Sequence, residues 1–305
     1  MQSIRFGRTD LTVSRLCFGC VSFGVADPAR GWDPFSAEGR ALGIRLIRAA
    51  RDRGVTLFDV SPDYGDGHAE MLLGEALRRD RDRAVIATKV DYGGRTAAEV
   101  TASVEASLRR LGTDCIDLVQ FHGGNYPPAS VKRILERGLL DALLALRAEG
   151  KIRHVGLTVA DPVTARTLIE TGAFDTVQMM YSLAEQAAAR HALDWCAARD
   201  LGVTVMRPLA AGMLGPLFTA LAPRWAESHD LAEVCLKFLL CDPRVHTLNV
   251  GMRSEAELGR NADLIDGFVP PIDVAALPRS VGAAARRATV PVPARSNNEE
   301  TVKAP

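Results

Sequence analysis

The chain has 305 residues, with 37 Lys and Arg balanced by 37 Asp and Glu, so its formal net charge is zero. Hydrophobic residues make up 47% and charged residues 24%, a balance that excludes a chain that is disordered throughout. A basic footprint for nucleic acid or anionic lipid is absent, and no apolar run reaches the ~18 residues that a membrane helix needs. We therefore expect a local site for a small molecule, and neither a nucleic acid nor a membrane partner.

Cysteine usage and the start of the chain indicate the compartment. Residues 1–8 are charged and lead into no apolar stretch, so no secretory signal is expected. The six cysteines are scattered, and the pair Cys17 and Cys20 has redox or zinc-site spacing without a second pair to complete it. We interpret both as reduced packing residues and predict a cytoplasmic protein without a metal. The Arg- and Ala-rich composition is typical of a bacterial source.

The chain opens with a predicted β-hairpin over 1–12, whose turn residues run from Gly7 to Asp10. After it, short β-rich runs alternate with amphipathic helical segments such as 41–50. Most runs are rich in Val, Ile and Leu and alternate only in part, as strands buried on both faces do. The predicted strands cover 13–19, 56–61, 84–90, 116–122, 152–159, 176–181, 203–209 and 245–252.

Capping residues mark where the helices begin and end. Thr96 with Glu99 and Ser254 with Glu257 have the spacing of capping boxes. Several glycines follow helical segments and are expected to adopt the left-handed conformation of a helix C-terminus. These are Gly54, Gly112, Gly150, Gly172 and Gly202.

Eight β/α units predict an α/β protein of the (β/α)8 TIM-barrel class, with an N-terminal β-hairpin that closes the bottom and an irregular C-terminal tail. An open doubly wound sheet is the alternative, but the Rossmann pattern G-x-G-x-x-G is missing after the first strand. We expect one barrel domain over 1–268. The Pro- and Ala-rich residues 269–305 are expected to be a tail, either partly disordered or, over part of 270–290, a flap over the site.

Four ionisable residues fall at the carboxyl ends of predicted strands, where barrel enzymes carry their catalytic groups. Asp59, Lys89 and His122 close the second, third and fourth strands, and Tyr64 follows the second. Each alone also suits a structural role. Together they suit general acid catalysis at a carbonyl, because a phenol of pKa about 10 needs a neighbouring ammonium to stabilise its phenolate. A carboxylate would hold that ammonium, and a neutral imidazole would orient the carbonyl.

Several motifs in fixed order resemble the aldo-keto reductase superfamily over roughly residues 3–265: FGRT at 6–9, LFDVSPDYG at 57–65, ATK at 87–89, DCIDL at 114–118, GLT at 156–158 and RPLAAGML at 207–214. The resemblance implies that Tyr64 is the proton donor and that Lys89 and Asp59 tune its acidity. It implies that His122 orients the substrate. The hydride would come from a reduced nicotinamide.

The resemblance also implies a set of cofactor contacts. Gln178 matches the residue that holds the carboxamide, and Tyr181 matches the ring that stacks on the nicotinamide. The remaining positions are Cys20, Thr158, Arg207, Leu209, Gly212, Leu214, Gly251, Arg253, Ser254, Glu257 and Asn261. Arg253 would pair with a 2′-phosphate, which favours NADPH over NADH, although a solvated Arg253 and a Ser254 that only caps a helix are the alternatives.

Three positions depart from the family pattern and bear on cofactor affinity. Val159 follows Thr158 where the family usually has Asn after Ser, so one carboxamide contact is lost. Cys20 replaces a small polar residue, and Arg260 replaces a Glu near the adenine.

Aromatic residues in the loops predict the substrate class. Trp32, Phe35, Tyr92 and Tyr126 are candidate walls for a bulky or ring-bearing carbonyl, with packing on the barrel as the alternative. The prediction is an NADPH-dependent carbonyl reductase, monomeric or homo-oligomeric. A nicotinamide-binding accessory or sensor subunit with little turnover is one alternative. A barrel isomerase or eliminase that uses Tyr64 and Lys89 is another.

Overall fold

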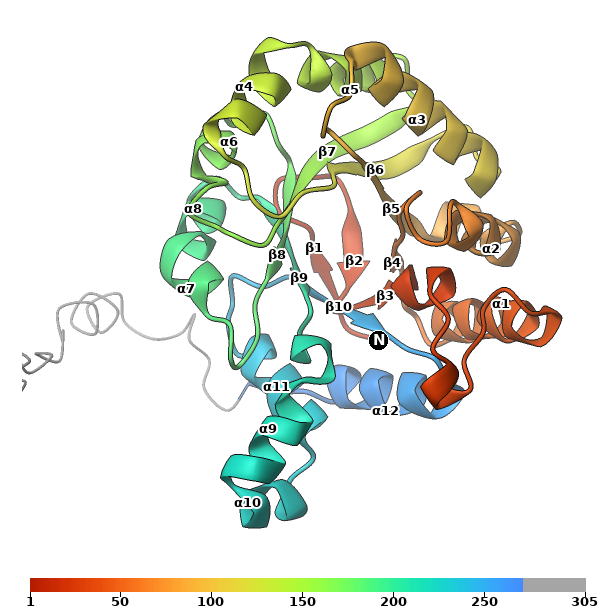
Figure 1. Cartoon of the computed structure of the whole chain (residues 1–305), viewed down its shortest axis with the longest axis vertical. Coiled ribbons are helices and arrows are strands. Elements are labelled where there is room, and N and C mark those ends of the chain that lie inside the picture. Colours follow the sequence, from red (N-terminus) through yellow and green to blue (C-terminus); the bar gives the residue numbers. More distant parts are fainter. Residues whose placement is uncertain (271–305) are drawn as a thin grey trace, which may run out of the picture. The chain divides into compact units, whose positions relative to one another are not determined.

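A computed structural model describes residues 1–270 of the chain as a closed barrel of eight parallel strands (Figure 1). Around the barrel the order is β10-β3-β4-β5-β6-β7-β8-β9, which is chain order, as successive β/α units require. The predicted (β/α)8 class is confirmed. The strands are β3 (Leu16–Gly19), β4 (Leu57–Asp59), β5 (Val85–Val90), β6 (Ile116–Phe121), β7 (Ile152–Val159), β8 (Thr176–Met180), β9 (Gly202–Met206) and β10 (Thr247–Gly251).

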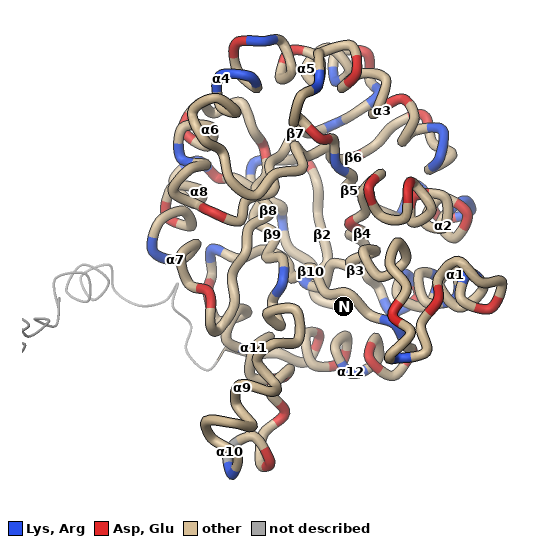
Figure 2. The backbone as a smooth tube through the Cα atoms, in the orientation of Figure 1, with Lys and Arg blue, Asp and Glu red and all other residues tan. Residues whose placement is uncertain are grey.

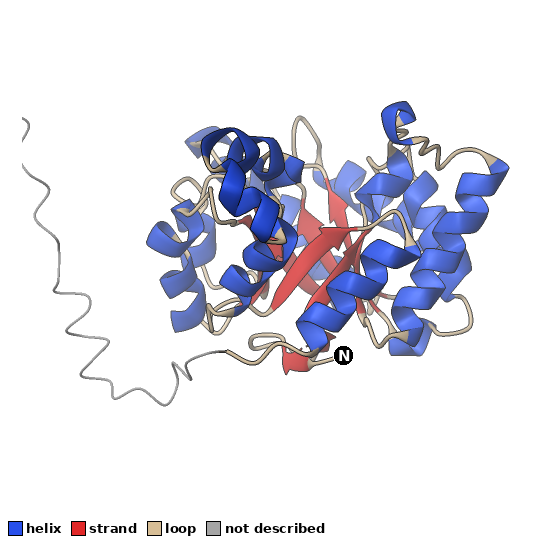
Figure 3. Ribbon diagram, turned by 90° about the horizontal axis from the view of Figure 1, so that it is seen from below, coloured by secondary structure: helices blue, strands red, loops and turns tan. Residues whose placement is uncertain are grey.

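Helices surround the strands as an outer ring (Figure 1), and the view turned by 90° in Figure 3 shows the strands lying between helices. They are α1 (Ala37–Asp52), α2 (His68–Leu77), α3 (Ala97–Leu111), α4 (Pro128–Glu136), α5 (Leu139–Ala148), α6 (Arg166–Glu170), α7 (Ala187–His191), α8 (Leu193–Ala198), α9 (Leu214–Leu221), α10 (Pro223–Ser228), α11 (Leu231–Leu240) and α12 (Glu255–Asp266). Short 3₁₀ turns lie at Cys20–Gly24, Pro28–Arg30, Arg81–Arg83 and Ala210–Gly212. Basic and acidic residues are interspersed along the ring, in keeping with the zero formal charge (Figure 2).

The N-terminal hairpin closes the bottom of the barrel. Strands β1 (Ser3–Arg5) and β2 (Thr12–Ser14) pair antiparallel, which confirms the predicted hairpin. Its apolar side chains Phe6, Leu11 and Val13 pack as one buried cluster with interior residues of the first four barrel strands. Burying these side chains stabilises the barrel and fills the end opposite the site.

Two predicted details of the local structure are wrong. The run 13–19 is not one strand, because Ser14 ends β2 and exchanges hydrogen bonds with Thr56 before β3 begins. Gly202 does not end a helix either. Asp200 has the left-handed conformation (φ 51°) after α8, whereas Gly202 opens β9 beneath the Phe6 ring, where a Cβ atom would lie only 2.9 Å from that ring.

The predicted caps are confirmed with one difference. Thr96 and Glu99 form the reciprocal capping box of α3. Ser254 caps α12 by accepting from Glu257 N, but the Glu257 carboxylate accepts from Arg253 N and not from the cap residue. The other four predicted glycines, Gly54, Gly112, Gly150 and Gly172, all have positive φ.

Residues Met1–Val269 form one compact unit. The exact boundary of the barrel domain at 268 stays a prediction. The predicted tail lies outside the described residues from 271 onward. Among the residues that the structure describes, no helix is long and apolar enough to cross a membrane.

Candidate active site

A buried ion pair lies at the carboxyl ends of two neighbouring strands. Asp59 ends β4, and Lys89 lies near the end of β5. Lys89 Nζ donates to Asp59 Oδ1 at 2.6 Å and to the Val60 carbonyl at 2.9 Å, and each side chain is only 2% exposed. The second oxygen of Asp59 accepts from Gln178 Nε2 at 2.8 Å. Buried charges are tolerated when they are paired and hydrogen-bonded in this way.

Tyr64 lies directly over this pair. Lys89 Nζ is 4.9 Å from the centroid of the Tyr64 ring. Burial opposes the charge on Lys89, but Asp59 and Tyr64 together outweigh it and raise the pKa of the ammonium. Burial also raises the pKa of Tyr64, while Lys89 acts on it in the opposite direction. Tyr64 therefore holds its proton at neutral pH, next to a cation that would stabilise the phenolate left after proton transfer.

His122 completes the cluster from the end of β6. Its backbone N–H donates to the Val90 carbonyl, which fixes the residue next to β5. The imidazole stands edge-on to the Tyr64 ring, with the ring centroids 6.2 Å apart and the planes at 83°. The structure thus brings all four predicted catalytic residues together, and their catalytic roles stay predictions.

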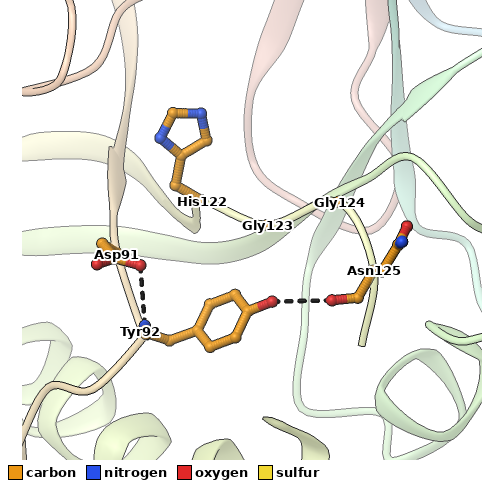
Figure 4. A pocket seen from close by; sticks show the side chains of 7 residues that line it. Asp91, Tyr92, His122, Gly123, Gly124 and Asn125 are labelled. Atoms are coloured by element: carbon orange, nitrogen blue, oxygen red, sulfur yellow. Dashed lines mark hydrogen bonds between the residues drawn. The ribbon is translucent and has the colours of Figure 1, made fainter. Parts of the chain in front are cut away.

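A pocket of about 540 Å³ opens beside this cluster (Figure 4). His122 and Tyr92 line it, and the Tyr92 hydroxyl donates to the Asn125 carbonyl at 2.9 Å. Its other lining residues are Asp91, Gly93, Gly123 and Gly124. The volume falls in the range of sites for small organic ligands.

The four aromatic residues predicted to contact substrate fall into two groups. Trp32 and Tyr126 are buried: the Trp32 indole donates to the Ser22 carbonyl, and the Tyr126 ring stacks behind Tyr92 at 5.4 Å. Phe35 is 51% exposed and lies against the turn that follows Tyr64. Tyr92 and Phe35 thus reach the surface near the site, whereas Tyr126 supports Tyr92 from behind and Trp32 packs against Phe23. Their contact with a substrate stays a prediction.

The residues predicted to hold the nicotinamide make contacts within the protein. Gln178 donates to Asp59, and Thr158 Oγ1 lies 2.7 Å from the Gly123 carbonyl and accepts from Gly123 N at 2.8 Å. Cys20 is fully buried, which raises the pKa of its thiol. Tyr181 contacts Phe238 edge-on at 5.7 Å, and its burial raises its pKa to about 12.

The loop that follows β9 carries backbone strain. Arg207, Ala210 and Ala211 all have positive φ (55°, 49° and 54°), which residues other than glycine rarely adopt, and Gly212 follows with φ 82°. Such strain is concentrated at ligand-binding loops. Leu209 and Leu214 flank this turn, and Leu214 is buried.

Arg253 lies between the end of β10 and α12, after the exposed Gly251. Its Nη1 is 3.2 Å from Asp27 Oδ2, and its Nε is buried without a hydrogen-bond partner among the described residues. Arg253 thus pairs with Asp27, and both its predicted role toward a 2′-phosphate and the alternative of a solvated side chain stay predictions. The Ser254 cap is formed, and Asn261 is buried on α12.

A sequence model of the aldo/keto reductase family matches residues 15–277. The chain belongs to the aldo/keto reductase family. It is 30% identical over 233 residues to an NADH-specific methylglyoxal reductase of Escherichia coli (strain K12). The aligned residues cover 70% of this chain and 69% of that protein. A second methylglyoxal reductase of the same organism is 32% identical over 216 residues, with 67% and 72% covered.

Solved structures agree with this assignment. An aldo/keto reductase from Klebsiella pneumoniae in complex with NADPH matches with a TM-score of 0.71 and 26% identity, over 99% of each chain. Family membership makes this aldo/keto reductase an NAD(P)H-dependent oxidoreductase that reduces carbonyl compounds.

Sequence reasoning missed three residues of this aldo/keto reductase site. Gln120 Nε2 lies 3.4 Å from Asp59 Oδ2, Asp63 contacts His122, and Asp27 pairs with Arg253. Strand alternation could have found Gln120, because it lies two residues before His122 and points to the same side. Asp63 and Asp27 lie in loops, where no periodic signal shows which way a side chain points.

Proposed function

We propose that this aldo/keto reductase reduces a bulky or cyclic aldehyde or ketone to the alcohol, with NADPH as reductant and Tyr64 as proton donor. The balanced reaction consumes the carbonyl compound, NADPH and one proton, and it yields the alcohol and NADP⁺. We expect the enzyme to act in the bacterial cytoplasm, as a monomer or homo-oligomer.

The observation that carries the proposal is the buried Asp59–Lys89 pair under the Tyr64 ring. When bound, a reduced nicotinamide supplies hydride to the carbonyl carbon. Tyr64 then gives its proton to the developing alkoxide, and Lys89 stabilises the phenolate that remains. Asp59 keeps Lys89 charged and in place. Because Tyr64 stays protonated at neutral pH, the acid is ready before each turnover.

The residues predicted to hold the phosphate of the cofactor fit it better than the residues predicted to hold its nicotinamide. The Nε of Arg253, which has no hydrogen-bond partner within residues 1–270, is a buried donor next to the N-terminus of α12, a combination that suits a phosphate. At the other end Gln178 already donates to Asp59, so it would hold a carboxamide only through its remaining hydrogen-bonding groups. The complex with NADPH and the NADH-specific relative make both forms worth testing.

Pocket size and the aromatic residues at its edge support a bulky substrate. The pocket beside His122 has about 540 Å³ and is lined by Tyr92, and the exposed Phe35 lies against the turn that follows Tyr64. Both E. coli relatives are named for methylglyoxal, a small dicarbonyl, which is therefore the reference compound for any substrate screen.

The test compares the wild type with Tyr64→Phe in two assays. Carbonyl reduction should fall by about 10²–10⁴-fold, because the general acid is lost. Quenching of protein fluorescence by NADPH and by NADH should stay as in the wild type, with tighter binding of NADPH. This binding is an internal control for folding. An equal loss of reduction and binding would contradict the role of Tyr64, and cyclic ketones that react more slowly than methylglyoxal would contradict the substrate class.

A further inference from the structure

A second carboxylate contacts the site, and the proposed mechanism does not use it. Asp63 Oδ2 lies 2.8 Å from Nδ1 of His122, and Ser61 Oγ lies 3.3 Å from the same nitrogen. Asp63 is the residue directly before Tyr64, so one short loop carries both the proton donor and the partner of the histidine. Its backbone N–H donates to Ser61 Oγ at 3.2 Å, which holds this loop in shape.

The contact determines which nitrogen of His122 carries a proton. An ionised carboxylate only accepts hydrogen bonds, so a separation of 2.8 Å requires Nδ1 to be a donor. A neutral imidazole has a single N–H. If that N–H lies on Nδ1, then Nε2 has a lone pair and accepts. Nε2 can donate to a carbonyl oxygen only when the ring is protonated on both nitrogens.

We propose that Asp63 is a positioning residue that fixes the proton of neutral His122 on Nδ1, so that His122 assists carbonyl reduction only as the imidazolium and not as the neutral ring that the sequence led us to expect. This rests on the proposed function. The neutral ring would direct a lone pair toward the carbonyl oxygen, whereas the imidazolium donates a hydrogen bond to it.

Other ionisable groups around His122 do not supply a pH dependence of carbonyl reduction. Tyr64 lies edge-on to the ring of His122. Its raised pKa means that Tyr64 stays protonated from pH 6 to pH 9. Lys89 lies beneath Tyr64, and its raised pKa keeps it charged throughout. Asp91 and Tyr92 come from the end of β5 and line the same pocket as His122. The pKa of Tyr92 is raised by burial.

The experiment measures kcat/KM for carbonyl reduction from pH 6 to pH 9 in the wild type and in Asp63→Asn. The wild type should lose at least about tenfold over this range, because imidazoles in general change from the cation to the neutral ring between acid and alkaline solution. An Asn amide at position 63 can donate to Nδ1, which leaves a neutral ring with its N–H on Nε2. The variant should therefore change less than about twofold. Asp66→Asn is the control, because its exposed side chain lies in the same loop and its φ of 51° suits Asn equally.

A second readout does not depend on turnover. Nitrogen NMR of the imidazole at high pH should show the neutral proton of His122 on Nδ1 in the wild type and in Asp66→Asn, and on Nε2 in Asp63→Asn. A neutral wild-type ring with its proton on Nε2 would overturn the proposal, as would equal pH profiles in the wild type and Asp63→Asn. A wild type with the Nδ1 proton but no carbonyl reduction would overturn the proposed function alone.

Discussion

The two ends of the barrel use charge in opposite ways. At the top, Asp59 and Lys89 form a pair that is almost fully buried. At the bottom, the buried Asp117 and several partly exposed groups share partners in a chain. Arg153 bridges Asp10 and Asp117, Arg81 also binds Asp117, and the hairpin is joined to the barrel through these contacts.

This difference separates activity from stability. The buried pair at the top has no solvent to replace a lost partner, so one substitution leaves an isolated charge. The bottom network has several partners for each charge and is open to water, so the loss of one contact is buffered. Barrel enzymes generally keep chemistry at the carboxyl ends of the strands and stability at the other end.

The largest expected effect comes from Lys89→Met. It leaves Asp59 buried without its cation, and we expect a loss of about 3–5 kcal/mol in the free energy of unfolding. Carbonyl reduction should fall by about 10²–10⁴-fold, because no ammonium stabilises the phenolate of Tyr64. Urea unfolding and steady-state rates check the two effects.

A surface lysine is the matched control. Lys132 on α4 has a side chain that is 64% exposed, so Lys132→Met should change stability by no more than about 0.5 kcal/mol. Adding Asp59→Asn to Lys89→Met should recover part of the stability and none of the activity. If Lys89→Met and Lys132→Met are equally stable, the buried pair does not behave as described.

A smaller effect is expected at the bottom, from Gly7→Ala in the hairpin turn. Gly7 has φ 58°, and a Cβ atom there would lie 2.1 Å from the backbone nitrogen of Gly202. Gly172→Ala is the control, because its φ of 72° is similar and no heavy atom lies within 4 Å of the added Cβ. The cost of a left-handed alanine is common to both, and the clash should cost Gly7→Ala about 1–3 kcal/mol more. Reduction per folded molecule should stay at the wild-type level, and a selective loss of activity would break the separation between the two ends.

The sequence predicted the parts of this molecule that depend on regular spacing. Each of the eight predicted apolar runs overlaps one strand of the barrel. Asp59, Lys89 and His122 lie close together because they are at the carboxyl ends of three of these strands. Strand alternation and the parallel sheet are sufficient for that result. Alternation determines to which side a side chain points, and the parallel sheet places the carboxyl ends of all strands at the same end of the barrel.

What the sequence could not predict depends on contacts between distant loops. Gly202 looked like a helix end, but the approach of Phe6 from the hairpin determines its conformation. Asp27 lies 226 residues from Arg253, and nothing local indicates that their side chains meet. Gln178 is predicted to contact a cofactor, but no local pattern indicates that it also donates to Asp59 across the barrel interior. Such pairings arise from tertiary packing, which local patterns do not encode.

The smallest expected effect is a pH dependence of stability that comes from His154 at the bottom. Its Nε2 lies 2.7 Å from Asp10 and its Nδ1 lies 3.6 Å from Asp175. Burial lowers the pKa of His154, but the two carboxylates outweigh it and raise the pKa overall. A raised pKa means that this contribution is fully present below about pH 6.5, the value for the unfolded chain, and is lost as pH rises through the folded value.

Asp10 does not contribute in that window, because Arg153 first and then His154 lower its pKa to about 2, and its share is lost only in acid. Urea unfolding of the wild type and His154→Gln at pH 5.5 and 8.5 checks the prediction. The stability advantage of the wild type should shrink by less than about 1 kcal/mol on going to pH 8.5, because Asp10 is largely exposed and screened. His191→Gln, at an exposed histidine of α7, should show no such change. An advantage that grows with pH would mean that His154 is bound as the neutral ring, and that the bottom network is held by its arginines alone.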